Sequence, residues 1–199
     1  MNFRKKRISQ ENIKEYLGDG DALPVRENLI EGVPLFIQRE YGHRNNCTIC
    51  SLAALLGFVT GADNQKAYDT VVKKAGRLFF RPEGRGTNPL AARFILNRAL
   101  RSAKTDKRSS ARYLKGVLFD FETLRGLIDG GVPAALSFYR DKNRYYKSHT
   151  VVVTGYCIYK TKNGTARFLM IYDNWNNTPS YLDYDGLSFF ASINYIKSR

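Results

Sequence analysis

The sequence predicts an α+β fold in which helices come first and an antiparallel sheet follows. Helical spacing of apolar residues prevails up to residue 128, and strand-like runs of β-branched and aromatic residues prevail after Gly130-Gly131. No internal repeat is present. With 199 residues, of which 43% are hydrophobic, the chain is long enough to bury the core of one domain.

The expected helices are short segments, and most begin at a residue that can cap a helix. Residues 102–110 between two of them are charged and contain several serines, which is typical of a mobile loop. The helices are expected at 9–17 with Ser9 as N-cap, from Cys47 to a stop at Gly57, at 63–74 with Asp63 as N-cap, after Thr87 with Pro89 in the first turn, and at 120–128 with Asp120 as N-cap.

The expected strands lie in the C-terminal half. The β-branched run at 148–156 is typical of a sheet interior, and Asn163-Gly164 is typical of a tight hairpin turn. Residues 33–38 are expected to be extended, with Pro34 at an edge or in a loop. The other strands are expected at 132–139, 167–172, 180–183 and 194–197.

Charge and cysteine content limit the function classes. Lys and Arg number 32 against 18 Asp and Glu, a net charge of +14, but the basic residues are spread along the chain and no RNA-binding or zinc-finger signature accompanies them. A solvated surface is therefore favoured over nucleic-acid binding. Three cysteines are too few for a disulfide scaffold, and the pair Cys47 and Cys50 lacks two further ligands at zinc spacing. No metal and no cofactor is expected.

Two segments are expected, an N-terminal extension at 1–32 that packs on or covers the domain, and the domain proper at 33–199. The basic N-terminus is not followed by an apolar stretch, so no signal peptide is predicted, and no apolar run is long enough to span a membrane. These features favour the cytoplasm by default, although a trimmed form of an exported protein would have the same pattern. The oligomeric state is left open.

The helix that begins at Cys47 is the first candidate for chemistry. Apolar residues from Ile49 to Leu56 are too continuous for a surface helix, so a buried helix is expected. A cysteine in the first turn lies beside unpaired N–H groups and the positive end of the helix dipole, which favour a thiolate. A buried helix with two inert cysteines is the alternative, as is Cys50 as the nucleophile.

A histidine and a carboxylate are expected to meet at one end of the hairpin. The only histidines are His43 and His149, and Asp173 follows His149 by 24 residues, with Asn163-Gly164 near the midpoint. Antiparallel pairing then brings His149 and Asp173 to the same end of the sheet. Asp173 can accept a hydrogen bond from one imidazole nitrogen and leave the other for Cys47. A turn role for Asp173, and Asn174 as the orienting residue, remain alternatives.

Three motifs in this order resemble the papain-like cysteine peptidases, particularly the bacterial branch related to the bacteriocin-leader (C39-like) peptidases. The motifs are residues 46–58 around Cys47, residues 148–156 around His149, and Asp173-Asn174-Trp175. The resemblance covers about residues 33–184. It implies a papain-like fold, with the N-terminal helical half carrying the nucleophile helix, a C-terminal antiparallel half, and the site in the cleft between them.

The resemblance also implies a role for each site residue. Cys47 would attack a carbonyl, His149 would protonate the leaving amine and then activate water, and Asp173 would fix the imidazole ring. The Cys47 N–H and a side chain would hold the oxyanion. That side chain is Gln38, with Asn45 and Asn46 as substitutes, and Trp175 would shield the histidine from water.

The expected activity is hydrolysis of peptide or amide bonds in a peptide or protein substrate. Acyl transfer or isopeptide cleavage on the same triad is an alternative, because loops rather than the triad set specificity. A non-catalytic basic binding module with a degenerate triad is a second alternative.

Overall fold

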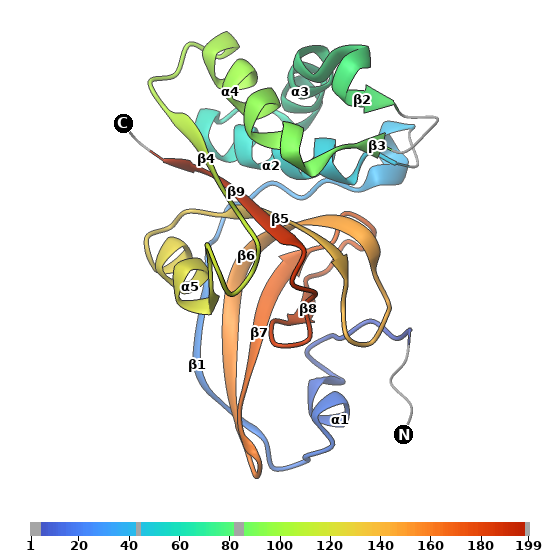
Figure 1. Cartoon of the computed structure of the whole chain (residues 1–199), viewed down its shortest axis with the longest axis vertical. Helices are drawn as coiled ribbons and strands as arrows, with labels where there is room; N and C mark the ends of the chain where they lie inside the picture. The colour runs from blue at the N-terminus through green and yellow to red at the C-terminus, as the bar shows by residue number, and fades with distance from the viewer. Residues whose placement is uncertain (1–4, 43–44, 82–85, 198–199) are drawn as a thin grey trace.

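Helices form one layer and an antiparallel sheet forms the other, as Figure 1 shows for the computed structural model. The structure describes residues 5–42, 45–81 and 86–197. This arrangement confirms the predicted α+β class with helices before the sheet. The helical layer contains α2 (Cys47–Thr60), α3 (Asn64–Phe79), the short pair β2 (Phe80–Arg81) and β3 (Gly86–Thr87), and α4 (Ala92–Ser102), while α5 (Phe121–Asp129) lies beside the sheet.

The sheet has seven strands, and its long strand β6 is the centre of the pairing. The order is β4-β9-β5-β6-β7-β8, with β1 paired to the second half of β6 where β5 no longer reaches. All of these pairs are antiparallel. The strands are β1 (Leu23–Leu29), β4 (Arg108–Tyr113), β5 (Ala134–Arg140), β6 (Lys147–Thr161), β7 (Gly164–Tyr172), β8 (Ser180–Asp183) and β9 (Ala191–Lys197).

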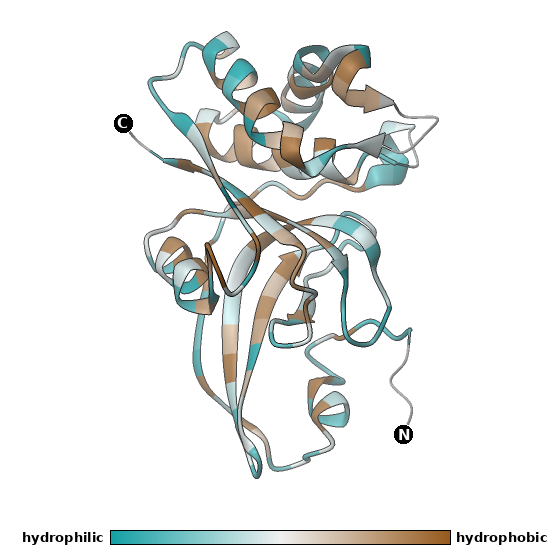
Figure 2. Ribbon diagram, viewed as in Figure 1, coloured by the Kyte–Doolittle hydropathy of each residue, from teal (hydrophilic) through white to brown (hydrophobic). Residues whose placement is uncertain are grey.

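Helix α2 is the core element that the sequence predicts. Every residue from Thr48 to Gly57 is buried, and Figure 2 shows hydrophobic segments on α2 and on the central strands. The expected stop at Gly57 is wrong, because α2 continues to Thr60 and ends at Gly61 in the left-handed conformation. Gly57 instead allows a close approach, since a Cβ there would lie 3.3 Å from the Pro34 ring.

The other helix boundaries follow capping chemistry, with two corrections. Asp63 and Asp120 cap α3 and α5 as predicted, through the N–H groups of Lys66 and Thr123. Asn88, not Thr87, caps the 3-10 turn Pro89–Ala91 before α4. The first helix, α1, spans only Ile13–Leu17 after Asn12, so Ser9 is not its cap. Two other parts of the chain also differ from expectation, since the charged loop at 102–110 ends in β4 and residues 38–41 form a 3-10 turn.

The N-terminal segment contributes directly to the sheet. Strand β1 pairs with β6 from Leu23 to Leu29, and the sequence did not predict it because none of residues 23–29 is buried and the polar run 26–28 interrupts its apolar residues. Helix α1 packs through Ile13 into a small second core that includes Phe168 and Tyr181. The predicted hairpin turn is confirmed, with Thr161 opposite Gly164.

Gly155 lies at the bulge where β1 and β7 both pair with β6. A Cβ on Gly155 would lie 2.6 Å from the Asn28 carbonyl oxygen and 3.0 Å from the Met170 sulfur. We expect Gly155→Ala to lower the free energy of unfolding by about 1–3 kcal/mol because β1 must move. Urea unfolding measures this effect, and Gly20→Ala is the control, since no atom lies within 4 Å of its Cβ position. Equal stability of the two variants would contradict the tight docking of β1.

Candidate active site

Cys47 lies in a cleft of about 1120 Å³ that is lined from both layers. It is the first residue of α2 and is partly exposed, because the polar loop before it leads directly into the buried helix. Residues of α2, α3 and α4 line one side of the cleft, and residues of β4, β5, β6 and β9 line the other. The helix places the Cys47 N–H among the unpaired donors of its first turn.

His149 lies on β6 with its imidazole fixed on three sides. Its Nε2 is 2.7 Å from the main-chain carbonyl oxygen of Asp173, so Nε2 carries the proton and the other ring nitrogen is left for a thiol. The ring of Tyr146 stacks on it with centroids 5.4 Å apart, and the ring of Trp175 lies 4.2 Å away. His149 is 4% exposed. The side chain therefore has one defined orientation.

The thiol of Cys47 contacts the His149 side chain, and this contact changes its acidity. Burial raises the pKa of Cys47, but the hydrogen bond and charge of His149, together with the N–H and hydroxyl of Thr150, bring that pKa down to about 7. Burial raises the pKa of the Cys50 thiol, which is fully buried, and the nearby Cys47 raises it further. Cys157 is also buried, and its pKa is raised to about 12. Of the three thiols, only that of Cys47 has a lowered pKa and is partly exposed.

Asp173 reaches His149 through its main chain and not through its carboxylate, which differs from the expectation. The carboxylate accepts hydrogen bonds from Trp175 N–H, Asn176 N–H and Nδ2, Tyr146 Oη and Ser180 Oγ, at 2.7–3.0 Å. These contacts shape the turn after β7, because a carboxylate in this position binds the N–H groups two and three residues on. The Asp173 carboxylate therefore has a turn role, while its main-chain carbonyl contacts His149.

Asn174 and Trp175 complete the turn. Asn174 is in the left-handed conformation, and its Nδ2 donates to Ser51 Oγ at 2.9 Å, to Thr150 O at 3.0 Å and to Cys47 O at 3.3 Å. It joins the nucleophile helix to the sheet and does not contact the imidazole in its place. Trp175 is 40% exposed and covers one face of His149.

The candidate oxyanion donors have different positions. Gln38 and Asn45 both line the cleft with Cys47. Asn46 is fully buried, and its Oδ1 accepts from Gln38 Nε2 at 2.9 Å while its Nδ2 donates to Tyr68 Oη at 3.0 Å. Asn46 therefore holds the Gln38 amide in place. His43, the second histidine, is outside the described residues.

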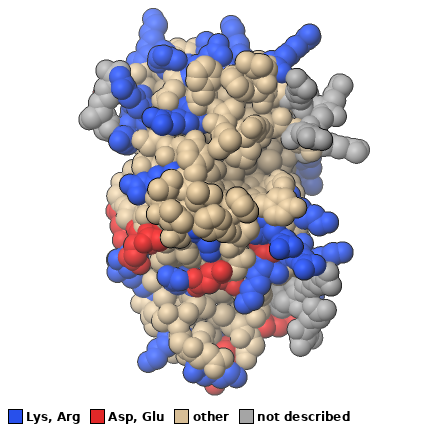
Figure 3. Space-filling view, viewed as in Figure 1, with Lys and Arg blue, Asp and Glu red and all other residues tan. Residues whose placement is uncertain are grey.

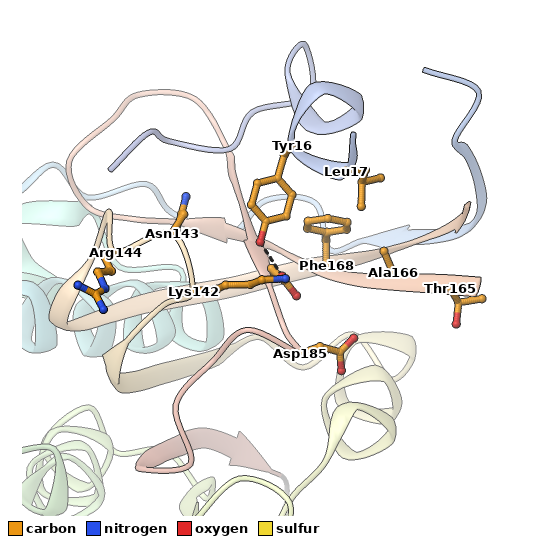
Figure 4. A pocket seen from close by; sticks show the side chains of 10 residues that line it. Tyr16, Leu17, Lys142, Asn143, Arg144, Thr165, Ala166, Phe168 and Asp185 are labelled. Carbon is orange, nitrogen blue, oxygen red and sulfur yellow. Dashed lines mark hydrogen bonds and ion pairs between the residues drawn. The ribbon is translucent and has the colours of Figure 1, made fainter. Parts of the chain in front are cut away.

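A second cavity of about 710 Å³ lies between α1 and the sheet (Figure 4). Its polar side chains contact one another: Tyr16 Oη donates to Asp183 Oδ2 at 2.6 Å, and Lys142 lies 3.8 Å from the same oxygen. Burial raises the pKa of Tyr16, and Asp183 adds to this effect, so its hydroxyl stays protonated. These contacts give the second cavity a structural role.

On the face in Figure 3, basic side chains lie on both halves of the molecule, and the acidic side chains lie on the sheet half. The basic residues of α4 and β4 lie close together, because Ser109 N–H donates to Asn97 Oδ1 at 2.9 Å.

No helix in the described ranges has the length and apolar character needed to cross a bilayer.

Sequence reasoning missed three residues around the site: Tyr146, Ser137 and Thr150. Tyr146 stacks on His149 and donates to Asp173, while Ser137 and Thr150 are cross-strand partners on β5 and β6. The sequence contains one signal for Thr150, which is its position directly after His149. Ser137 could be found only from the strand register.

Comparisons with known proteins add the family. The sequence matches the model of the Peptidase_C39 like family over residues 30–199. No curated protein matches the chain. Among solved structures, the crystal structure of SERA5E from Plasmodium falciparum is similar with a TM-score of 0.47 and 11% identity, over 99% of this chain and 98% of that chain. Because the family match covers most of the sequence, the chain belongs to the Peptidase_C39 like family of cysteine peptidases.

Proposed function

We propose that this protein hydrolyses peptide bonds with Cys47 as the nucleophile and His149 as the general acid and base. The observation that carries the proposal is the contact between the partly exposed Cys47 thiol and the His149 side chain at the wall of a large cleft. A thiol with a pKa of about 7 is half ionised at neutral pH, which provides the thiolate that peptide cleavage by cysteine requires.

The proposed reaction has two halves. The Cys47 thiol passes its proton to the free ring nitrogen of His149. The thiolate attacks the scissile carbonyl, the C–N bond breaks, and His149 gives that proton to the leaving amine, which leaves a thioester on Cys47. His149 then takes a proton from water, the hydroxide attacks the thioester, and the acid product leaves as the thiolate returns. Both tetrahedral intermediates place an oxyanion near the Cys47 N–H.

Gln38 is the proposed second donor to that oxyanion. It lines the cleft beside Cys47, and the buried Asn46 and Tyr68 hold its amide at one end of a hydrogen-bond chain. A donor that is already oriented stabilises the developing charge without reorganising during the reaction. Asn45 lines the same cleft and is the alternative donor.

The Asp173 carbonyl is proposed to orient the imidazole in place of a carboxylate. A main-chain oxygen accepts the Nε2 proton at 2.7 Å and fixes the tautomer in which the other nitrogen faces Cys47. Trp175 and Tyr146, which also contact each other, shield the ring from water.

The cleft wall indicates which part of a substrate would lie beside the scissile bond. Large apolar side chains that are at least half exposed line it: Leu78, Leu90, Phe94, Tyr139 and Phe190. Exposed apolar patches of this kind mark binding grooves in soluble proteins. We propose that bulky apolar residues of the peptide contact this wall.

Incubation with a peptide library, followed by mass spectrometry of the products, tests the function. We expect cleavage in the wild-type protein, enrichment of bulky apolar residues near the cut, and no cleavage above background in Cys47→Ala. Cys50→Ala is the matched control and should keep activity, because that thiol is buried. Cleavage that persists in Cys47→Ala, or is lost only in Cys50→Ala, would refute the assignment.

A further inference from the structure

Three hydroxyl groups meet beside the nucleophile, and the proposed function gives them no role. Thr150 Oγ1 is 2.9 Å from Thr48 Oγ1 and 2.9 Å from Ser137 Oγ. The three side chains are 2–4% exposed and come from α2, β5 and β6. A cluster of buried hydroxyls has few arrangements that satisfy all its members, because each hydroxyl has a single proton.

Thr150 lines the cleft beside Cys47, and one Asn174 amide donates to the carbonyl oxygens of both residues. The Thr150 hydroxyl and N–H lower the pKa of the Cys47 thiol by hydrogen bonding to its sulfur. The Thr150 hydroxyl oxygen thus has two hydroxyl neighbours, and its proton has three acceptors to choose from. If Thr48 and Ser137 both donate to Thr150, the Thr150 proton is left for the sulfur. If Thr150 donates to either neighbour, the sulfur loses that donor. A negative charge on sulfur selects the first arrangement, since hydrogen bonds to an ionised acceptor are the stronger ones.

We propose that Thr48, Ser137 and Thr150 form a hydroxyl relay that aims the Thr150 hydroxyl at the Cys47 thiolate, which makes Thr150 a positioning residue for the nucleophile. The relay joins the two layers at the site, because Thr48 belongs to the nucleophile helix and Ser137 and Thr150 belong to the sheet. Asn174 reinforces it, since its Nδ2 donates to the Thr150 carbonyl.

The relay acts on the resting thiolate and not on the oxyanion. A donor to the thiolate makes ionisation easier and also lowers the intrinsic reactivity of the ion, because nucleophilicity falls with pKa. Loss of the donor therefore has two opposite consequences, a higher midpoint of ionisation and a faster reaction of the fully ionised thiol. A variant that merely disturbs the fold would not produce this pair of effects.

The test is the pH profile of Cys47 alkylation by iodoacetamide in the full-length protein, with the site of labelling read by mass spectrometry. Wild-type labelling should rise with pH through a midpoint near 7. In Thr150→Val we expect the midpoint to move up by about one pH unit and the limiting rate at high pH to rise about threefold. Thr150→Ser keeps the hydroxyl and should restore the wild-type profile.

Ser137→Ala removes one supporting hydroxyl and leaves Thr150 intact. We expect its midpoint to move up by about 0.3 unit, because Thr150 is less well oriented. A midpoint in Thr150→Val or Ser137→Ala equal to that of the wild type would overturn the relay. This inference depends on the proposed thiolate nucleophile, but the two can fail separately. A wild-type midpoint near that of an ordinary thiol would refute the proposed function. A wild-type midpoint near 7 that does not change in Thr150→Val and Ser137→Ala would refute only the relay.

Discussion

Replacement of His149 by alanine is expected to slow peptide cleavage by about 10⁶-fold. The imidazole supplies the proton for the leaving amine, and it is the group that lowers the pKa of Cys47 most strongly. Without it, the main effects that oppose burial of the thiol are lost, so the alkylation midpoint of Cys47 should rise from about 7 towards its usual value of 9.0. Steady-state cleavage and the pH profile of alkylation measure the two effects.

The sign of the pH effect follows from the lowered thiol pKa. Below pH 7 the wild-type thiol is mostly protonated and labels slowly, and labelling rises through that midpoint to a plateau. At pH 7 the thiolate fraction is about 50-fold larger than for a thiol of pKa 9, and lower intrinsic nucleophilicity reduces the rate advantage to about fivefold. Trp175→Phe is the control, since it keeps an aromatic cover over His149. An unchanged alkylation midpoint in His149→Ala would show that His149 does not promote ionisation of Cys47.

Local signals were sufficient for the parts of the fold that are fixed by neighbouring residues. The buried run after Cys47, the caps at Asp63 and Asp120, and the turn at Asn163-Gly164 all act within a few residues, and the structure contains each of them. Strand β1 has no such signal. Its exposed residues form a strand because the second half of β6 offers an edge that β5 does not cover.

The same distinction applies to the site. Hairpin geometry was enough to bring His149 and Asp173 to one end of the sheet, where they are in contact. Which atom of Asp173 makes that contact depends on the turn after β7, and the turn depends on Asn174 in the left-handed conformation and on Ser180 from the next strand. Residue types and spacing do not encode this choice, since the carbonyl and the carboxylate belong to the same residue.

Substitutions of Asp173 therefore test whether its carboxylate has a structural role or a catalytic one. Asp173→Ala removes the acceptor of five hydrogen bonds in a fully buried position, so we expect the free energy of unfolding to fall by about 3–5 kcal/mol. Asp173→Asn should cost less, because the hydroxyls of Tyr146 and Ser180 can rotate to donate elsewhere. Urea unfolding measures both, and Asp185→Ala, which breaks an exposed pair with Arg167, should cost less than about 1 kcal/mol.

The catalytic readout of Asp173→Asn decides between the two roles. The Asp173 carbonyl remains in this variant, so the His149 ring keeps its acceptor and the alkylation midpoint of Cys47 should stay within about 0.5 unit of the wild type at a temperature where the variant is folded. A triad carboxylate predicts the reverse, with stability preserved and cleavage reduced by about 10⁴-fold. If Asp173→Asn is as stable as the wild type but does not cleave, the carboxylate and not the carbonyl orients the imidazole. If it is destabilised but still cleaves with a thiol midpoint near 7, the main chain holds the ring and the carboxylate holds the main chain.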